Sequence, residues 1–358
     1  MNIIFDAEKV GNNISFYQQL IIKNLKGEVD LKKLSLFVVV ALTLTLVMGF
    51  STMGMAQDDF KVGMVTDVGG LGDESFNDAA WAGLQRAEEE FGITINVIES
   101  NTMTDYVPNL SSLAEQGYDM VWAIGFLMTD ALTEVSGMYP NVKFGIIDAV
   151  VEGDNVVSAT FKEHEGSFLA GVVAGMRTET DKVGYIGGME MPLIKKFEAG
   201  YRAGVKAVNP DAEIFISYTG AFDDPQAGKE LAFTQFDQGA DVIYHASGAC
   251  GIGVIKAANE RGLYAIGVDS PQNHLAPANV LTSMIKRVDV AVYNEVKKLY
   301  NENFEAGHHV YGLANNGVGV YRPQADNMLS QEIIDTVDEY KQKIIDGEVE
   351  VPTHPDEL

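Results

Sequence analysis

The chain has 358 residues, 46% of them hydrophobic, so it can bury a substantial core in one large domain or two lobes. Its formal net charge of −26 argues against nucleic acids and anionic membrane surfaces as partners, because both repel an acidic protein. The only cysteine is Cys250, which excludes an intrachain disulfide and a CxxC motif, and the histidines form no HExxH pattern; we expect neither a metal nor a cofactor.

The N-terminal region is typical of an exported protein. Residues 31–56 combine two lysines, a long apolar run, and Gly54 and Ala56 at the −3 and −1 positions of a cleavage site. We interpret this segment as a Sec signal peptide that is cleaved after Ala56. A membrane anchor is the alternative, because the length of the apolar run is borderline for a transmembrane helix.

Residues 1–30 precede the basic region of this signal, although such a region normally stands at the extreme N-terminus. We therefore interpret them as an extension that results from a wrong choice of start codon, with an unusually long leader as the alternative. No cysteine follows the cleavage point. A free periplasmic or secreted protein is thus expected rather than a lipid-anchored one.

From residue 61 onward, short apolar segments alternate with amphipathic ones. The first set predicts strands over residues 61–68, 93–99, 119–125 and 142–150, with helices over residues 76–92, 106–117 and 128–140. Continuous apolar strands that alternate with helices are typical of a parallel sheet covered on both faces.

The pattern then restarts. The second set predicts strands over residues 182–188, 213–220, 241–247 and 264–270, and helices over residues 165–177, 193–209, 225–239 and 251–262. A tail follows, with strands over residues 280–287 and 311–320 and helices over residues 288–304 and from residue 330. The tail is too short for a third domain, so we expect it to cross between two lobes that enclose a cleft.

This organisation gives an N-terminal lobe over residues 57–160, to which about residues 288–312 return. The C-terminal lobe spans residues 161–287 and takes about residues 313–358, although the assignment of the last helix is open. Ligands of open α/β sheets bind at the carboxyl ends of the strands. Two such edges would face each other across the cleft.

Acidic, aromatic and glycine residues follow several of these predicted strands. Singly, an acid at a strand end is often only a helix cap, and a lone phenylalanine is more often part of the core. Together, carboxylates from both lobes, a phenylalanine from each lobe and a lysine suit a neutral, polyhydroxylated ligand with a flat ring. Anionic ligands would be repelled, because clustered arginines are missing.

The pattern resembles the basic membrane protein family, the purine-nucleoside-receptor-like substrate-binding components of ABC importers. The matching segments stand in order over residues 60–351: VTDVGGLGDESFN, IDAVV, EGSFLAGVVAGM, VGYIGGMEMP, FEAGYRAGVKAVNPD, FDDPQAGKELA, GVIKAANERG, IGVDS and VLTSMIKR. The resemblance implies a type I periplasmic binding protein fold, with two doubly wound parallel-sheet lobes joined by a hinge. Many members of the family carry a lipoprotein cysteine, which this chain lacks at the expected position.

The resemblance also implies which residues bind the ligand: Asp67, Phe76, Asn77, Asp148, Phe222, Gly248, Asp269 and Lys286. Phe76 and Phe222 would stack on a base from opposite lobes. Asp67 would read the base edge beside Asn77, which would offer both a donor and an acceptor. Asp269 and Lys286 would hold the ribose hydroxyls.

We therefore expect a monomeric, non-catalytic receptor that binds a purine nucleoside, such as guanosine, inosine or adenosine, and delivers it to the permease subunits of an ABC transporter. A secreted nucleoside hydrolase is one alternative, although the segment DESFND is a poor version of the aspartate cluster that such an enzyme needs to bind calcium. A sensor or autoinducer-binding protein on the same fold is the other.

Overall fold

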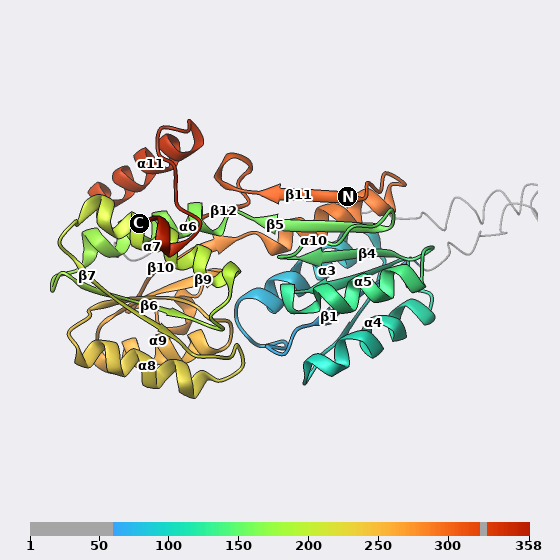
Figure 1. Cartoon of the computed structure of the whole chain (residues 1–358), viewed down its shortest axis with the longest axis horizontal. Coiled ribbons are helices and arrows are strands. Elements are labelled where there is room, and N and C mark those ends of the chain that lie inside the picture. The colour runs from blue at the N-terminus through green and yellow to red at the C-terminus, as the bar shows by residue number, and fades with distance from the viewer. Residues whose placement is uncertain (1–59, 323–327) are drawn as a thin grey trace, which may run out of the picture. The chain divides into compact units, whose positions relative to one another are not determined.

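The computed structural model describes residues 60–322 and 328–358, which form two α/β lobes (Figure 1). The predicted extension and signal peptide lie outside these described residues. Each lobe is built on a six-stranded sheet with helices between its strands. The prediction of two doubly wound, parallel-dominated α/β lobes is confirmed.

The first sheet is entirely parallel, with the strand order β11-β5-β4-β3-β1-β2. Its strands are β1 (Lys61–Thr66), β2 (Thr94–Ile98), β3 (Met120–Ile124), β4 (Lys143–Ile147), β5 (Val156–Phe161) and β11 (Gly307–Tyr311). Its helices are α3 (Phe76–Phe91), η2 (Met103–Asp105), α4 (Tyr106–Glu115), η3 (Phe126–Met128), α5 (Thr129–Met138) and α10 (Val288–Tyr300), which packs against α3.

The second sheet has the order β12-β10-β9-β8-β6-β7, and only the edge strand β12 runs antiparallel to its neighbour. Its strands are β6 (Lys182–Gly187), β7 (Glu213–Tyr218), β8 (Val242–Ala246), β9 (Tyr264–Asp269), β10 (Val280–Lys286) and β12 (Val318–Val320). The accompanying helices are α6 (Glu163–Arg177), α7 (Pro192–Val208), α8 (Pro225–Asp237), α9 (Cys250–Arg261), η4 (Asn273–Leu275), η5 (Leu313–Asn315), α11 (Gln331–Ile345) and η6 (Pro355–Glu357).

The central strands explain why the sequence shows continuous apolar runs. Every residue of β3 and of β8 is buried, because helices cover both faces of each sheet. The helices end where the sequence provides a suitable residue. Gly92 closes α3 with a φ of 67°, a left-handed conformation that glycine adopts without a steric penalty.

The predicted strand over residues 311–320 is wrong. The chain instead forms β11, the short helix η5 and β12, and the two strands belong to different sheets. A turn separates them, in which the Gly317 N–H donates to the Gly312 carbonyl and Asn316 has a φ of 56°. The segment therefore connects the lobes, and β11 joins the first sheet although it follows the second lobe in sequence.

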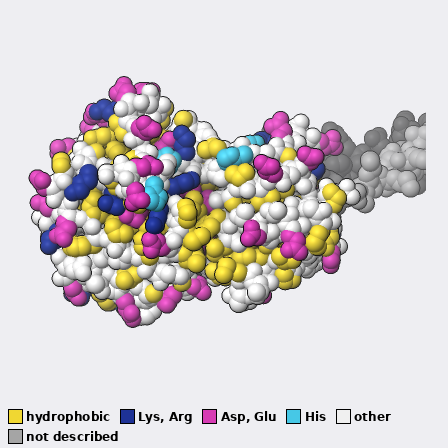
Figure 2. All heavy atoms as spheres, in the orientation of Figure 1, with side chains coloured by type: hydrophobic (Ala, Val, Ile, Leu, Met, Phe, Trp, Pro, Cys, Tyr) yellow, Lys and Arg dark blue, Asp and Glu magenta, His cyan; other side chains and the backbone are white. Residues whose placement is uncertain are grey.

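Acidic side chains are spread over both lobes on the face shown in Figure 2, whereas lysines and arginines gather mainly on the second lobe. On this face the acidic side chains are therefore distributed and do not form one acidic block. None of the helices formed by residues 60–322 and 328–358 is long and apolar enough to span a membrane.

Candidate functional site

A cavity between the two lobes is lined by every residue that the sequence predicted for the site. The first lobe contributes Asp67, Phe76, Asn77 and Asp148, and the second contributes Phe222, Gly248, Asp269 and Lys286. The empty space of the cavity, including the part open to solvent, is about 520 Å³.

The first lobe presents hydrogen-bond acceptors to this cavity. Asp67 Oδ1 accepts from the Gly69 N–H and from Asn77 Nδ2, each at 2.9 Å, and Asn77 Nδ2 also donates to Asp73 Oδ2 at 3.2 Å. Both amide hydrogens of Asn77 are thus engaged, while its buried Oδ1 has no hydrogen-bond partner in the part of the chain that the structure describes. The expectation that Asn77 offers a donor as well as an acceptor is therefore wrong.

The second carboxylate oxygen of Asp67, Oδ2, is another hydrogen-bond acceptor of this lobe. The hydrogen bonds that the Asp67 side chain accepts within the described residues involve only Oδ1. Burial raises the pKa of Asp67 to about 6, although the bonds from Asn77 and Gly69 oppose the shift. The carboxylate is thus largely ionised at neutral pH and can accept a proton just below it.

Asp73 also lines the cavity and was not predicted. It accepts from the backbone N–H groups of Ser75, Asn77 and Asp78, and so organises the start of α3. Burial raises its pKa to about 7. In the sequence it reads as one of several loop acids, and only its position ahead of a helix start hints at this role.

The aromatic lining is more extensive than the predicted pair of phenylalanines. Phe222 is only 8% exposed, and its ring packs edge to face against Phe126, with centroids 6.4 Å apart and planes at 83°. Phe126 follows β3 in the first lobe and was not predicted as a site residue. The Phe222 ring packs directly against Gly188, where a Cβ atom would lie 2.2 Å from the ring and would clash with it.

A buried charge cluster around Lys286 also belongs to the predicted site. Lys286 is 2% exposed, and its Nζ lies 2.5 Å from Asp148 Oδ2 across the lobes and 3.6 Å from Glu163 Oε1. The Nζ also lies about 5 Å from the ring centroids of Phe76 and Phe161. Burial lowers the pKa of Lys286, but the surrounding carboxylates outweigh it and hold the pKa above its ordinary value.

Glu163 belongs to this cluster and was not predicted. It is fully buried at the first position of α6, and neither carboxylate oxygen has a hydrogen-bond partner among residues 60–322 and 328–358. Lys196 Nζ lies 3.6 Å from its Oε2. Burial raises its pKa to about 7. The sequence signal is weak, because an acid in the first turn of a helix is common for electrostatic reasons alone.

Two aspartates of the site have backbones that are unusual for residues other than glycine. Asp148 and Asp269 follow β4 and end β9, with φ values of 69° and 62°. Such left-handed residues are enriched at functional sites. Asp269 Oδ2 accepts from Ser75 Oγ of the first lobe at 2.5 Å, and burial raises the pKa of Asp269 to about 6.

Gly248 lies just after β8 with a φ of 57°. A Cβ there would stand 3.1 Å from the carbonyl oxygen of Phe222, so the loop packs closely against the aromatic lining. Residues 60–322 and 328–358 contain no group of three or more His, Cys, Asp or Glu side chains placed to hold a metal ion.

Comparisons with known proteins identify the family of this chain. The profile of the Bmp family, described as ABC transporter substrate-binding protein PnrA-like, matches residues 60–354. A CD4+ T-cell-stimulating antigen of Listeria monocytogenes is 42% identical over 320 residues, which cover 83% of this chain and 89% of the relative. The ABC transporter nucleoside-binding protein BmpA of Lactococcus lactis is 38% identical over 325 residues, or 84% of this chain and 92% of that protein.

Solved structures agree on the fold. An ABC transporter solute-binding protein from Aeropyrum pernix superimposes with a TM-score of 0.76 at 32% identity, covering 83% of this chain and 95% of that one. Another, from Conexibacter woesei, gives 0.68 at 24% identity, with 82% and 99% covered. The fold is that of type I periplasmic binding proteins, and the chain belongs to the Bmp family of PnrA-like substrate-binding proteins of ABC transporters.

Proposed function

We propose that this protein is an extracytoplasmic receptor that binds purine nucleosides in the cavity between its lobes and delivers them to an ABC permease. The observation that carries the proposal is the composition of that cavity. It combines buried carboxylates from both lobes with several phenylalanines and one buried lysine. The Lactococcus lactis relative is named as a nucleoside-binding protein, which supports this ligand class.

The base would lie among the phenylalanines, with its edge toward Asp67 and Asn77. Because Asp67 Oδ2 and Asn77 Oδ1 are both acceptors, they suit a base edge that carries donors. Guanine presents N1–H and its 2-amino group side by side, hypoxanthine presents N1–H alone, and adenine presents a bare acceptor at N1. We therefore expect guanosine to bind best, inosine next and adenosine more weakly.

The ribose would lie against the charged end of the cavity. Asp269 and Asp148 accept hydrogen bonds from hydroxyl groups, and the Lys286 ammonium group donates to a hydroxyl oxygen. In this structure Lys286 Nζ pairs with Asp148 Oδ2, while Asp148 Oδ1 is buried without a partner among the described residues, and Ser75 donates to one oxygen of Asp269. A bound ribose would take over part of these contacts and would supply a donor to the unpaired Asp148 Oδ1.

The remaining parts of the proposal concern delivery. The protein would leave the cytoplasm through the signal peptide over residues 31–56 and act as a monomer without catalytic activity. Membership of a family of substrate-binding proteins supports both the location and the non-enzymatic role.

Calorimetry on residues 57–358 tests the proposal directly. Ligand carried over from expression is first removed by unfolding and refolding, and the protein is then titrated with guanosine, inosine, adenosine, cytidine and uridine. Tight purine binding with weaker pyrimidine binding is expected, because a pyrimidine stacks less area. Chromatography of the same mixtures should show no free base, and release of base would indicate a nucleoside hydrolase instead. No heat with any purine nucleoside would refute the proposed ligand class.

A further inference from the structure

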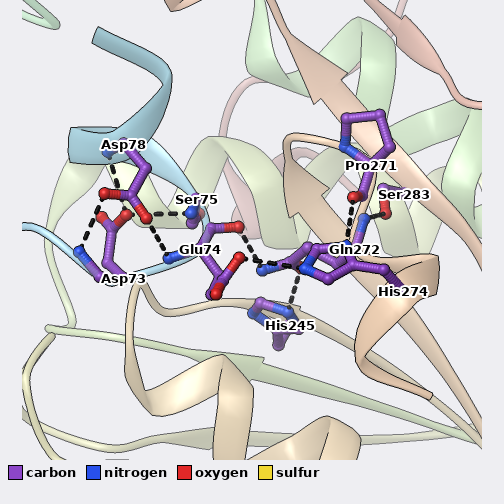
Figure 3. Close-up of polar contacts among 10 residues, drawn as sticks. Asp73, Glu74, Ser75, Asp78, His245, Pro271, Gln272, His274 and Ser283 are labelled. Atoms are coloured by element: carbon purple, nitrogen blue, oxygen red, sulfur yellow. Dashed lines mark hydrogen bonds and ion pairs between the residues drawn. The ribbon is translucent and has the colours of Figure 1, made fainter. Parts of the chain in front are cut away.

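The two lobes also contact each other outside the residues that line the cavity. The backbone carbonyl of Glu74, in the first lobe, accepts from Gln272 Nε2 of the second lobe at 3.0 Å (Figure 3). Beside it, at the exposed rim, the Glu74 carboxylate lies 3.1 Å from His274 Nε2. Gln272 is fully buried and does not line the cavity, so this contact needs no ligand to form.

The second lobe holds the Gln272 amide in one orientation. Its Oε1 accepts from the Val268 N–H. The same oxygen lies 2.9 Å from His245 Nε2, and the backbone N–H of Gln272 donates to Ser283 Oγ (Figure 3). Burial lowers the pKa of His245 to about 4, so the imidazole is neutral, and its one N–H must be on Nε2 to bond an oxygen. Gly267 makes room, because a Cβ there would stand 2.5 Å from Oε1.

The first-lobe partner of this amide is the loop that carries the site. Glu74 has a φ of 54°, which is unfavourable for a glutamate, and it directly precedes Ser75, Phe76 and Asn77. Ser75 in turn bonds Asp269 across the lobes. Docking of Glu74 on Gln272 therefore brings Phe76 and Asn77 to the second lobe at the same time.

We propose that Gln272 is a positioning residue that stabilises the closed form and so sets how long a ligand stays bound, without touching the ligand. The proposal rests on the proposed function, since it assigns the closed form to a nucleoside receptor. A bond made only between closed lobes stabilises every closed complex equally. Its loss should therefore weaken all nucleosides by one common factor.

The size and kinetics of that loss follow from the chemistry of the contact. Removal of Gln272 Nε2 leaves a part-buried carbonyl without its partner, which corresponds to about 5- to 150-fold weaker binding. Ligand meets the open form first, so the association rate constant should change little and the dissociation rate constant should rise by this factor. A change confined to folding stability would alter neither rate constant in this way.

The experiment compares Gln272→Met and Gln272→Glu with Gln235→Met. Glutamate keeps the acceptor for Val268 but loses the donor to Glu74, whereas methionine loses both. Gln235 is an equally buried glutamine of the same lobe, and its Nε2 donates only within that lobe, to the Tyr185 carbonyl and to Ser217 Oγ. It is therefore the matched control. Stopped-flow fluorescence with guanosine, inosine and adenosine gives both rate constants, and small-angle scattering without ligand reports the closed fraction.

In each Gln272 variant, the dissociation rate constants of the three nucleosides should rise by one common factor. Gln235→Met should have a lower melting temperature but unchanged dissociation rate constants. The proposal would be overturned if nucleosides dissociated from both Gln272 variants at the wild-type rate. It would also be overturned if the increase in the dissociation rate constant differed between nucleosides by more than threefold. If wild type binds no nucleoside, the proposed function fails by itself. Ligand-free scattering then decides on Gln272, where a larger radius of gyration for both variants supports the proposal and unchanged curves overturn it.

Discussion

The substitution Asp67→Asn tests how the site reads the base. In wild type, Oδ1 is held by Gly69 and Asn77, and Oδ2 is left for the ligand. An asparagine can keep its oxygen on these two donors, which places its NH₂ group where Oδ2 stood. The substitution thus turns an acceptor at the base edge into a donor and changes little else in the lobe.

The expected magnitude follows from this exchange. The N1–H of guanosine would face a donor, and an unsatisfied buried polar group costs about 1–3 kcal/mol, which is about 5- to 150-fold in affinity. Adenosine has an acceptor at N1, so its affinity should stay constant or rise. The ratio of guanosine affinity to adenosine affinity should therefore fall by at least about fivefold.

Calorimetry at pH 8 with both nucleosides measures this ratio, and Asp130→Asn, which removes the same charge from an exposed position of the first lobe, is the control. The pH dependence gives a second test. Because burial raises the pKa of Asp67 to about 6, the ionised acceptor is present above pH 6 and is lost as the pH falls through 6. The wild-type ratio should fall over that range. Equal losses for both nucleosides in Asp67→Asn would refute base reading by this carboxylate.

Further predictions concern stability, the ribose, stacking and closure. Burial raises the folded-state pKa of Glu163 to about 7, against an ordinary 4.5. The free energy of unfolding should therefore be highest below pH 4.5 and fall by roughly 3 kcal/mol between pH 4.5 and 7, because the unfolded chain releases this proton first. Urea unfolding of Glu163→Gln should lack this dependence, whereas Ser158→Ala, a buried substitution without a charge, should shift stability equally at each pH. If the Glu163→Gln curve parallels wild type, the carboxyl is not buried as described. Calorimetry should show 2′-deoxyguanosine binding about 5- to 150-fold more weakly than guanosine, and equal affinities would remove Asp269 from its ribose role. Phe222→Ala should weaken all purine nucleosides together, by about 1–3 kcal/mol in calorimetry, and an effect on only one of them would contradict simple stacking. Scattering should show a smaller radius of gyration with saturating guanosine, and an unchanged radius would show that ligand does not close the lobes.

The sequence predicted the fold where burial leaves a strong pattern. The segment MVWAI is apolar throughout because both faces of β3 are covered, so it could be recognised as a central strand. The edge strands β11 and β12 have the sequences GHHVY and VGV, which contain polar residues and glycines. Their positions depend on pairing with β5 and β10, and a single segment does not reveal such pairing.

The site was predictable to the extent that it lies at strand ends. Asp67, Asp148 and Asp269 each end a strand or follow one closely, where the topology places ligands. Phe126 and Glu163 were missed for a different reason. In the sequence they are indistinguishable from a core aromatic residue and a helix-start acid. The approach of the second lobe brings Phe222 to Phe126, whereas Glu163 meets Lys286 through the packing of α6 and β10 within the second lobe.

A crystal structure of residues 57–358 with guanosine tests the central claim most directly. The account predicts that the base lies in the cavity between the lobes, with N1–H and the 2-amino group on Asp67 and Asn77 and with the ribose hydroxyls on Asp269 and Lys286. Guanosine bound elsewhere, or with its ribose toward Asp67 and its base toward Lys286, would contradict the account.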